Sequence, residues 1–307
     1  MTEKQTNSAE VRLTNGRLTV TIAPLGAELQ NLRSEVSGRE YLWQGDPYYW
    51  DGRATNLFPV CGRFDGGSYS LDGVDYEMMI HGFAKDEIFA VSQDGERAAG
   101  FALEENERTL RYWPRRFRYV IGYRLAEPDA ADAGRLEITS TVTNRDSRPL
   151  YFAIGGHPGF RIPLEDGLPF EAHRIRFPAP GHVQSVVLAE SKLDSGERVD
   201  FALTGDNAIA LRHELFEEDG IFLSGTGGRA RIEATGTDRS VTVDYPGFDW
   251  LGIWQAAGKQ SPYICIEPWT AMCGRHETHE ALETMPGLVE LAPGETRSWT
   301  WAITIAE

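Results

Sequence analysis

Apolar and polar residues alternate one by one along residues 18–22, 136–142, 241–245 and 299–305. In the first of these stretches Leu18, Val20 and Ile22 are separated by threonines. Successive side chains of a β-strand point to opposite faces, so each stretch predicts a strand with one face on a core. A helical period is scarce, and only residues 209–216 and 277–285 suggest short helices of about two turns each.

Turn residues separate the predicted strands. Asp72-Gly73 lies between two short apolar runs and predicts a two-residue hairpin turn. Residues 225–228 (Gly-Thr-Gly-Gly) weakly resemble a phosphate-binding loop, but a strand-like run follows them, so a hairpin turn is the favoured interpretation. The sequence shows no linker and no internal repeat. It therefore predicts an all-β fold, one large antiparallel β-sandwich domain over residues 1–307 with a flexible N-terminus at 1–10.

The charge balance excludes one class of partner. The chain carries 30 Lys+Arg against 46 Asp+Glu, a net charge of −16, which argues against binding to nucleic acid. The first residues are polar and no apolar run approaches the ~18 residues of a membrane span, so neither a secretory signal nor a membrane anchor is expected. Three cysteines do not suggest a disulfide framework. We expect a cytoplasmic protein.

One histidine-rich segment resembles a metal motif. In residues 276–280 (His-Glu-Thr-His-Glu) the histidines are three positions apart, whereas the zinc-protease pattern needs four. A polar turn is the favoured interpretation, and the sequence predicts no metal site.

Four short segments combine turn residues with polar side chains: residues 56–64, 80–86, 153–160 and 265–269. His157 stands between Gly-Gly and Pro-Gly, which predicts an imidazole held on an irregular loop. Glu267 follows an apolar run and precedes Pro-Trp, where a carboxylate is costly to desolvate without a partner or a task. Taken alone, His157 fits a structural histidine, Glu267 an ion pair with arginine, and Arg63 and His81 surface cations. Together, the carboxylate and the imidazole could act as base and acid on opposite sides of a sugar ring.

The motifs Gly-Gly-His-Pro (155–158) and Cys-Ile-Glu-Pro-Trp (265–269), in this order, resemble those of the aldose 1-epimerase (galactose mutarotase) family. Further matching segments, including residues 245–254 and 291–295, extend the resemblance from about Gly16 to the last predicted strand. The similarity is strongest to the bacterial branch near the hexose-6-phosphate mutarotases. It implies a large β-supersandwich and a mutarotase that needs no metal or organic cofactor.

The resemblance also implies roles for single residues. His157 matches the family's general acid and Glu267 its general base. Arg63 and His81 match substrate-binding positions. Asp219 resembles the aspartate that binds sugar hydroxyls, although the sequence around it matches more loosely. In the implied reaction the carboxylate takes the anomeric proton while a protonated imidazole donates to the ring oxygen. The sugar then opens, rotates about C1–C2 and recloses, so the rate would fall when Glu267 gains a proton or His157 loses one.

Two departures from the family pattern concern the substrate. Lys85 follows His-Gly-Phe-Ala where related sequences carry arginine, and lysine lacks the planar two-pronged donor. Residues 270–273 replace a segment that is expected to bear glycine. We expect Lys85 to be a substrate-binding residue at the mouth of the site.

Two alternatives stay open on the sequence alone. The first is a hexose-6-phosphate mutarotase, with Lys85 and Arg53 or Arg63 as phosphate partners. The second is a sugar-binding module that keeps the fold without turnover. The expected partner is a small-molecule sugar or sugar phosphate, and the protein is expected to be a monomer or a homodimer.

Overall fold

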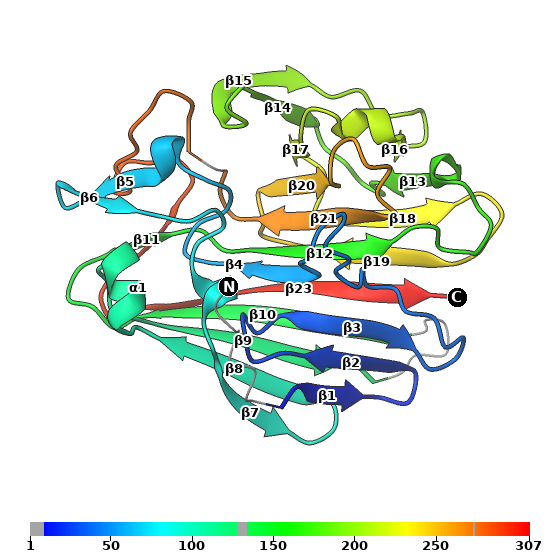
Figure 1. Ribbon diagram of the computed structural model, residues 1–307, viewed down its shortest axis with the longest axis horizontal. Coiled ribbons are helices and arrows are strands. Elements are labelled where there is room, and N and C mark those ends of the chain that lie inside the picture. The colour runs from blue at the N-terminus through cyan, green and yellow to red at the C-terminus, as the bar shows by residue number, and fades with distance from the viewer. Residues whose placement is uncertain (1–8, 128–133, 273) are drawn as a thin grey trace.

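The computed structural model describes residues 9–127, 134–272 and 274–307, and Figure 1 shows two large antiparallel sheets in layers. Most of the predicted flexible N-terminus therefore lies outside the described residues, as does Cys273 of the departing segment. The nine-stranded sheet has the order β16 (Ala208–Ala210), β13 (His173–Arg176), β18 (Arg229–Ala234), β19 (Ser240–Asp244), β23 (Thr296–Ala306), β10 (Gly134–Asn144), β9 (Phe117–Leu125), β8 (Ala98–Glu104) and β7 (Ala90–Asp94).

The second layer is a seven-stranded sheet, accompanied by smaller sheets. Its order is β15 (Asp194–Asp200), β14 (Gln184–Leu188), β17 (Ile221–Ser224), β20 (Trp250–Trp254), β21 (Tyr263–Trp269), β12 (Gly155–Arg161) and β4 (Ala54–Leu57). The smaller sheets are β1 (Val11–Thr14), β2 (Leu18–Ile22) and β3 (Leu29–Ser34); β5 (Ser68–Leu71) and β6 (Val74–Glu77); and β11 (Leu150–Phe152) and β22 (Val289–Leu291).

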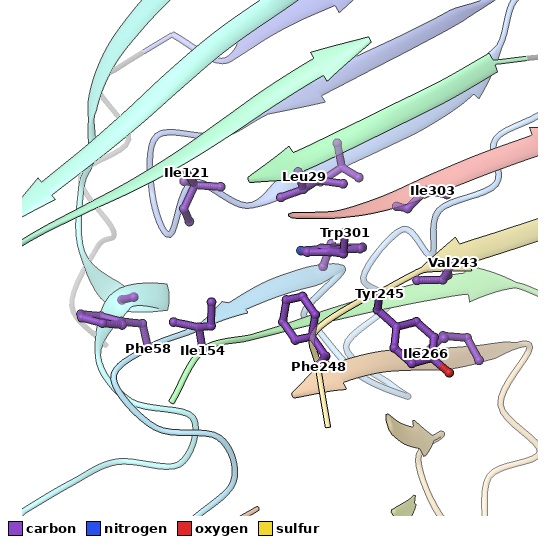
Figure 2. Packing of buried hydrophobic residues seen from close by; sticks show 14 of the residues in the cluster. Leu29, Phe58, Ile121, Ile154, Val243, Tyr245, Phe248, Ile266, Trp301 and Ile303 are labelled. Carbon is purple, nitrogen blue, oxygen red and sulfur yellow. The ribbon is translucent and has the colours of Figure 1, made fainter. Parts of the chain in front are cut away.

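The main core lies between the two layers. Ile121 of β9, Val243 of β19 and Ile303 of β23 come from the nine-stranded sheet and share one core cluster with Ile266 of β21 in the other layer, where Figure 2 shows Val243 close to Ile266. All four side chains are fully buried. Removing both inner faces from water at once supplies the main driving force for this architecture. The all-β antiparallel sandwich predicted from the period of two is confirmed.

The predicted strands and the predicted hairpin are present. The four alternating stretches fall in β2, β10, β19 and β23, and the burial of β10 alternates residue by residue along its whole length. Between β5 and β6, Asp72 and Gly73 have φ values of 53° and 74°. Positive φ at both central positions gives the turn the twist that matches its flanking strands.

The predicted helices are wrong. Residues 209–216 complete β16 and then form a single 3₁₀ turn, His213–Phe216, while residues 277–285 form turns without helix. Within the described ranges the α-helix is α1 (Glu107–Tyr112). Asn106 begins it by accepting hydrogen bonds from the backbone N–H groups of Arg108 and Thr109. A helix this short is too brief to show a repeating apolar pattern in the sequence. The signal that marks where it begins is therefore the capping residue. The described helices include none with the length and apolarity that a bilayer crossing needs.

The glycine-rich segment 225–228 is also not a hairpin. It joins β17 of the seven-stranded sheet to β18 of the nine-stranded sheet, so it carries the chain from one layer to the other. Gly225 and Gly227 have positive φ, and a Cβ at either position would collide with the backbone of residues 179 or 182. Glycine is needed here for close backbone approach, which neighbouring sequence does not reveal.

Candidate active site

Two central strands of the seven-stranded sheet carry the predicted acid and base. β12 pairs with β21 in a register that sets Gly155 opposite Trp269 and Gly159 opposite Cys265, which places His157 across from Glu267. Every residue of β21 is buried, because its two faces are covered. His157 therefore lies on a regular strand, and its expected placement on an irregular loop is wrong.

The glycines beside His157 leave space for neighbouring aromatic rings to pack against the strand. A Cβ on Gly156 would come within 2.6 Å of the Trp301 ring, and one on Gly159 within 3.1 Å of the Trp50 ring. Neither glycine has a positive φ. The Gly-Gly-His-Pro-Gly segment thus lets large aromatic rings approach the strand that holds the imidazole.

The imidazole and the carboxyl group are in direct contact. His157 Nε2 lies 3.2 Å from Glu267 Oε1, and the two residues are only 7% and 1% exposed. Burial lowers the pKa of His157 to about 4. Burial, reinforced by the negative charge of Asp219, raises the pKa of Glu267 well above its usual range. In the free site burial therefore favours the protonated carboxyl group and the neutral imidazole, which differs from the protonated His157 expected above.

The structure brings six predicted site residues to one cavity of about 500 Å³, whereas Arg53, the alternative phosphate partner, is not among the residues that line it and donates to the Gln30 carbonyl instead. Its walls include the predicted residues Arg63, His81, Lys85, His157, Asp219 and Glu267. They come from separate segments of the chain: Arg63 and His81 from loops, Lys85 from the 3₁₀ turn Ala84–Asp86, and Asp219 from the loop before β17. Their roles toward a substrate remain predictions.

His81 is held as a neutral hydrogen-bond donor. Its Nδ1 accepts the backbone N–H of Gly62 at 3.0 Å, so the ring carries its proton on Nε2. Burial lowers its pKa well below the usual value, and the positive charges of Lys85 and Arg63 act in the same direction. A neutral donor suits a sugar hydroxyl.

The cations of the cavity differ in how far they are already neutralised. Lys85 Nζ lies 2.7 Å from Asp86 Oδ2, and Lys192 Nζ lies 2.9 Å from Glu218 Oε2. The side chain of Arg63 makes no ion pair or hydrogen bond with the residues that the structure describes. Arg63 is thus the cation most available to a ligand.

Aromatic side chains that the sequence analysis did not single out complete the site. The ring centroids of Trp50 and His157 lie 4.7 Å apart with 31° between their planes, and Trp254 meets the same imidazole edge-on at 5.5 Å. The Trp50 backbone carbonyl accepts a hydrogen bond from Trp43 Nε1 at 2.9 Å, which ties down its loop. The run Tyr48-Tyr49-Trp50 between Pro47 and Gly52 was the available signal, because aromatic residues in turns are often binding residues.

One group of side chains has metal-ligand geometry. The ligand atoms of His157, Cys265 and Glu267 all lie within 4.8 Å of one another. The sequence motifs predicted no metal site, and no motif spacing connects these three residues. The histidine-rich segment instead forms a polar turn, where His276 contacts Ser191 and His279 contacts Asp75.

Comparisons with known proteins agree with this architecture. The sequence profile of the aldose 1-epimerase family matches residues 9–304. The chromosomal LacX protein of Lactococcus lactis subsp. lactis is 30% identical over 96% of this chain and 99% of its own.

Solved structures show the same fold. A galactose mutarotase-like protein from Lactobacillus casei superposes with a TM-score of 0.90 at 27% identity, covering 97% of this chain and 100% of that one. A galactose mutarotase related enzyme from Lactobacillus acidophilus gives 0.88 at 27% identity, covering 97% and 98%. With the family profile matched over almost the whole sequence, this chain belongs to the aldose 1-epimerase family.

Proposed function

We propose that this protein is an aldose 1-epimerase that interconverts the α and β anomers of an aldohexose. The observation that carries the proposal is the contact of 3.2 Å between a buried imidazole and a buried carboxyl group in the wall of a polar cavity. Anomer exchange needs one proton removed from the anomeric hydroxyl and one delivered to the ring oxygen. Both oxygens are bonded to C1, so adjacent acid and base groups can reach them together from one edge of the sugar. This arrangement differs from the acid and base on opposite sides of the ring that the sequence led us to expect.

The proton held by the dyad supplies both functions. Its transfer from Glu267 to His157 leaves the total number of protons unchanged and gives a carboxylate beside an imidazolium. Glu267 then accepts the proton of the anomeric hydroxyl while His157 donates to the ring oxygen, and the C1–ring oxygen bond breaks. After rotation about C1–C2 the same transfers run in reverse. The face of Trp50 stabilises the imidazolium as it forms.

Polarimetry tests this proposal. Freshly dissolved α-anomers of glucose, galactose and other aldohexoses should reach their equilibrium rotation faster with the protein than in buffer alone. A sugar-binding module of the same fold would bind a sugar in calorimetry and leave the rate at its buffer value.

The pH profile follows from the pKa directions. Activity needs one proton on the dyad, so it should fall when a second proton joins at His157, whose pKa is about 4, and again when the proton leaves Glu267, whose pKa burial raises well above its usual range. We therefore expect the acid limb of kcat/KM to lie near the lowered pKa of His157, about 4, in polarimetric assays corrected for buffer catalysis. An acid limb centred near the ordinary histidine pKa of about 6.5 would contradict these shifts.

A hexose 6-phosphate is the second candidate substrate, and the cations Arg63, Lys85 and Lys192 in the cavity wall favour it. A charged hydrogen bond is worth about 1.5–3 kcal/mol, so for this candidate Lys85→Ala should raise KM for the phosphorylated sugar about tenfold or more. KM for the neutral sugar should stay nearly constant. Asp86→Asn is the matched control, because it frees Lys85 from its ion pair and should not raise KM for the phosphate. An equal effect of Lys85→Ala on both sugars would remove this candidate.

A further inference from the structure

Cys265 lies beside the proposed acid and base and has no part in their chemistry. It precedes Glu267 by two positions on β21, so both side chains point to the same face of the sheet. Its side chain is fully buried and clusters with Trp43 and Tyr263. The thiol sulfur, an imidazole nitrogen of His157 and a carboxyl oxygen of Glu267 lie within 4.8 Å of one another.

These ligand types match a soft divalent ion. Zn²⁺ binds thiolate sulfur at about 2.3 Å, and imidazole nitrogen and carboxylate oxygen at about 2.0–2.2 Å, in a tetrahedron. Ligand atoms around one such ion lie about 3.3–3.7 Å apart. The 3.2 Å between His157 Nε2 and Glu267 Oε1 is already close to this separation. The thiol sulfur lies within 4.8 Å of the other two ligand atoms, so a side-chain adjustment brings all three to this separation.

The charge balance also favours binding. Thiolate and carboxylate are the forms that bind a metal ion, so Cys265 and Glu267 each supply one negative charge to a bound ion. The imidazole of His157 supplies a nitrogen lone pair without adding charge. Two negative ligands and one Zn²⁺ sum to zero, so no net charge remains in a site surrounded by aromatic rings.

We propose that His157, Cys265 and Glu267 form a binding site for Zn²⁺ or a chemically similar transition-metal ion, and that the bound ion inhibits the protein. The ion occupies the lone pairs that the dyad needs for proton transfer, so sugar turnover and metal binding exclude each other. The inhibition rests on the proposed function, whereas the metal site does not. Mg²⁺ prefers all-oxygen ligands and should not bind at this thiol.

Co²⁺ spectroscopy tests the site without any activity measurement. Titration of the metal-free protein with Co²⁺ should produce a thiolate-to-cobalt charge-transfer band in the near ultraviolet, and Zn²⁺ should displace it. The band should vanish in Cys265→Ser and Cys265→Ala, each checked for native circular dichroism. It should persist in Cys61→Ala, the matched control at another buried cysteine. No band in the wild type, or an undiminished band in both Cys265 variants, would overturn the proposal.

Inhibition is the second readout. Zn²⁺ should slow polarimetric turnover of the wild type, a chelator should restore it, and equal Mg²⁺ should have no effect. Relative to each variant's own metal-free rate, Cys265→Ala should need at least tenfold more Zn²⁺ for half inhibition. Equal sensitivity of the wild type and Cys265→Ala would contradict inhibition through this site. If the band forms but the wild type turns over no sugar, the metal site stands and the proposed function fails.

Discussion

Replacing His157 with asparagine is expected to lower kcat for anomer exchange by about 10²- to 10⁴-fold, the usual contribution of a positioned acid–base group. The amide keeps a hydrogen-bond donor in the space between Trp50 and Trp254, but it cannot give up and regain a proton. Because the lost interaction is one made in the transition state, KM should change far less than kcat. Polarimetric progress curves give kcat and KM, and calorimetric sugar titration gives the binding affinity separately.

His81→Asn is the matched control for this substitution. His81 also lines the cavity, and its ring lies 5.4 Å from that of His157, but the role predicted for it is sugar binding. We expect it to raise KM with a smaller loss of kcat. If His157→Asn kept normal kcat, or if the two variants behaved alike, His157 would not be the acid.

Phe58→Ala is expected to cost about 3–5 kcal/mol of the free energy of unfolding. Phe58 follows β4 and is fully buried. Its ring stacks on Tyr119 of β9 with centroids 4.4 Å apart, and it also meets Phe152 and Trp113. Truncation removes these contacts and leaves a cavity between the two layers (Figure 2).

Urea unfolding followed by fluorescence measures this loss. Phe58→Leu keeps most of the volume and should cost clearly less. Val74→Ala, at a residue 52% exposed, should lie within about 0.5 kcal/mol of the wild type. A loss below about 1 kcal/mol for Phe58→Ala would show that the aromatic cluster does not join the layers as described.

The strands were predictable wherever one face of a sheet is buried and the other is not. β10 shows this over its whole length, because each buried residue alternates with a half-buried one. β12 and β21 carry the site and are buried on both faces, so they show no alternation. For that reason His157 was expected on a loop although it lies on a strand.

The part of the candidate site that lies in recognisable sequence motifs was predictable. Segments far apart in the sequence supplied His157 and Glu267, and the structure brings them together. Their protonation was not predictable, because it follows from burial and from the neighbouring Asp219. The proximity of Cys265 to both groups depends on the register between β12 and β21, which no single segment encodes.

The most direct test of the account is the rate at which Glu267→Gln brings a fresh α-anomer to equilibrium, measured by polarimetry beside the wild type. Glutamine preserves the shape of the side chain and removes the group that accepts the anomeric proton. We predict that the variant keeps its fold and its sugar affinity in calorimetry, yet loses at least about 10²-fold in kcat. A folded Glu267→Gln protein with wild-type turnover would contradict the acid–base dyad.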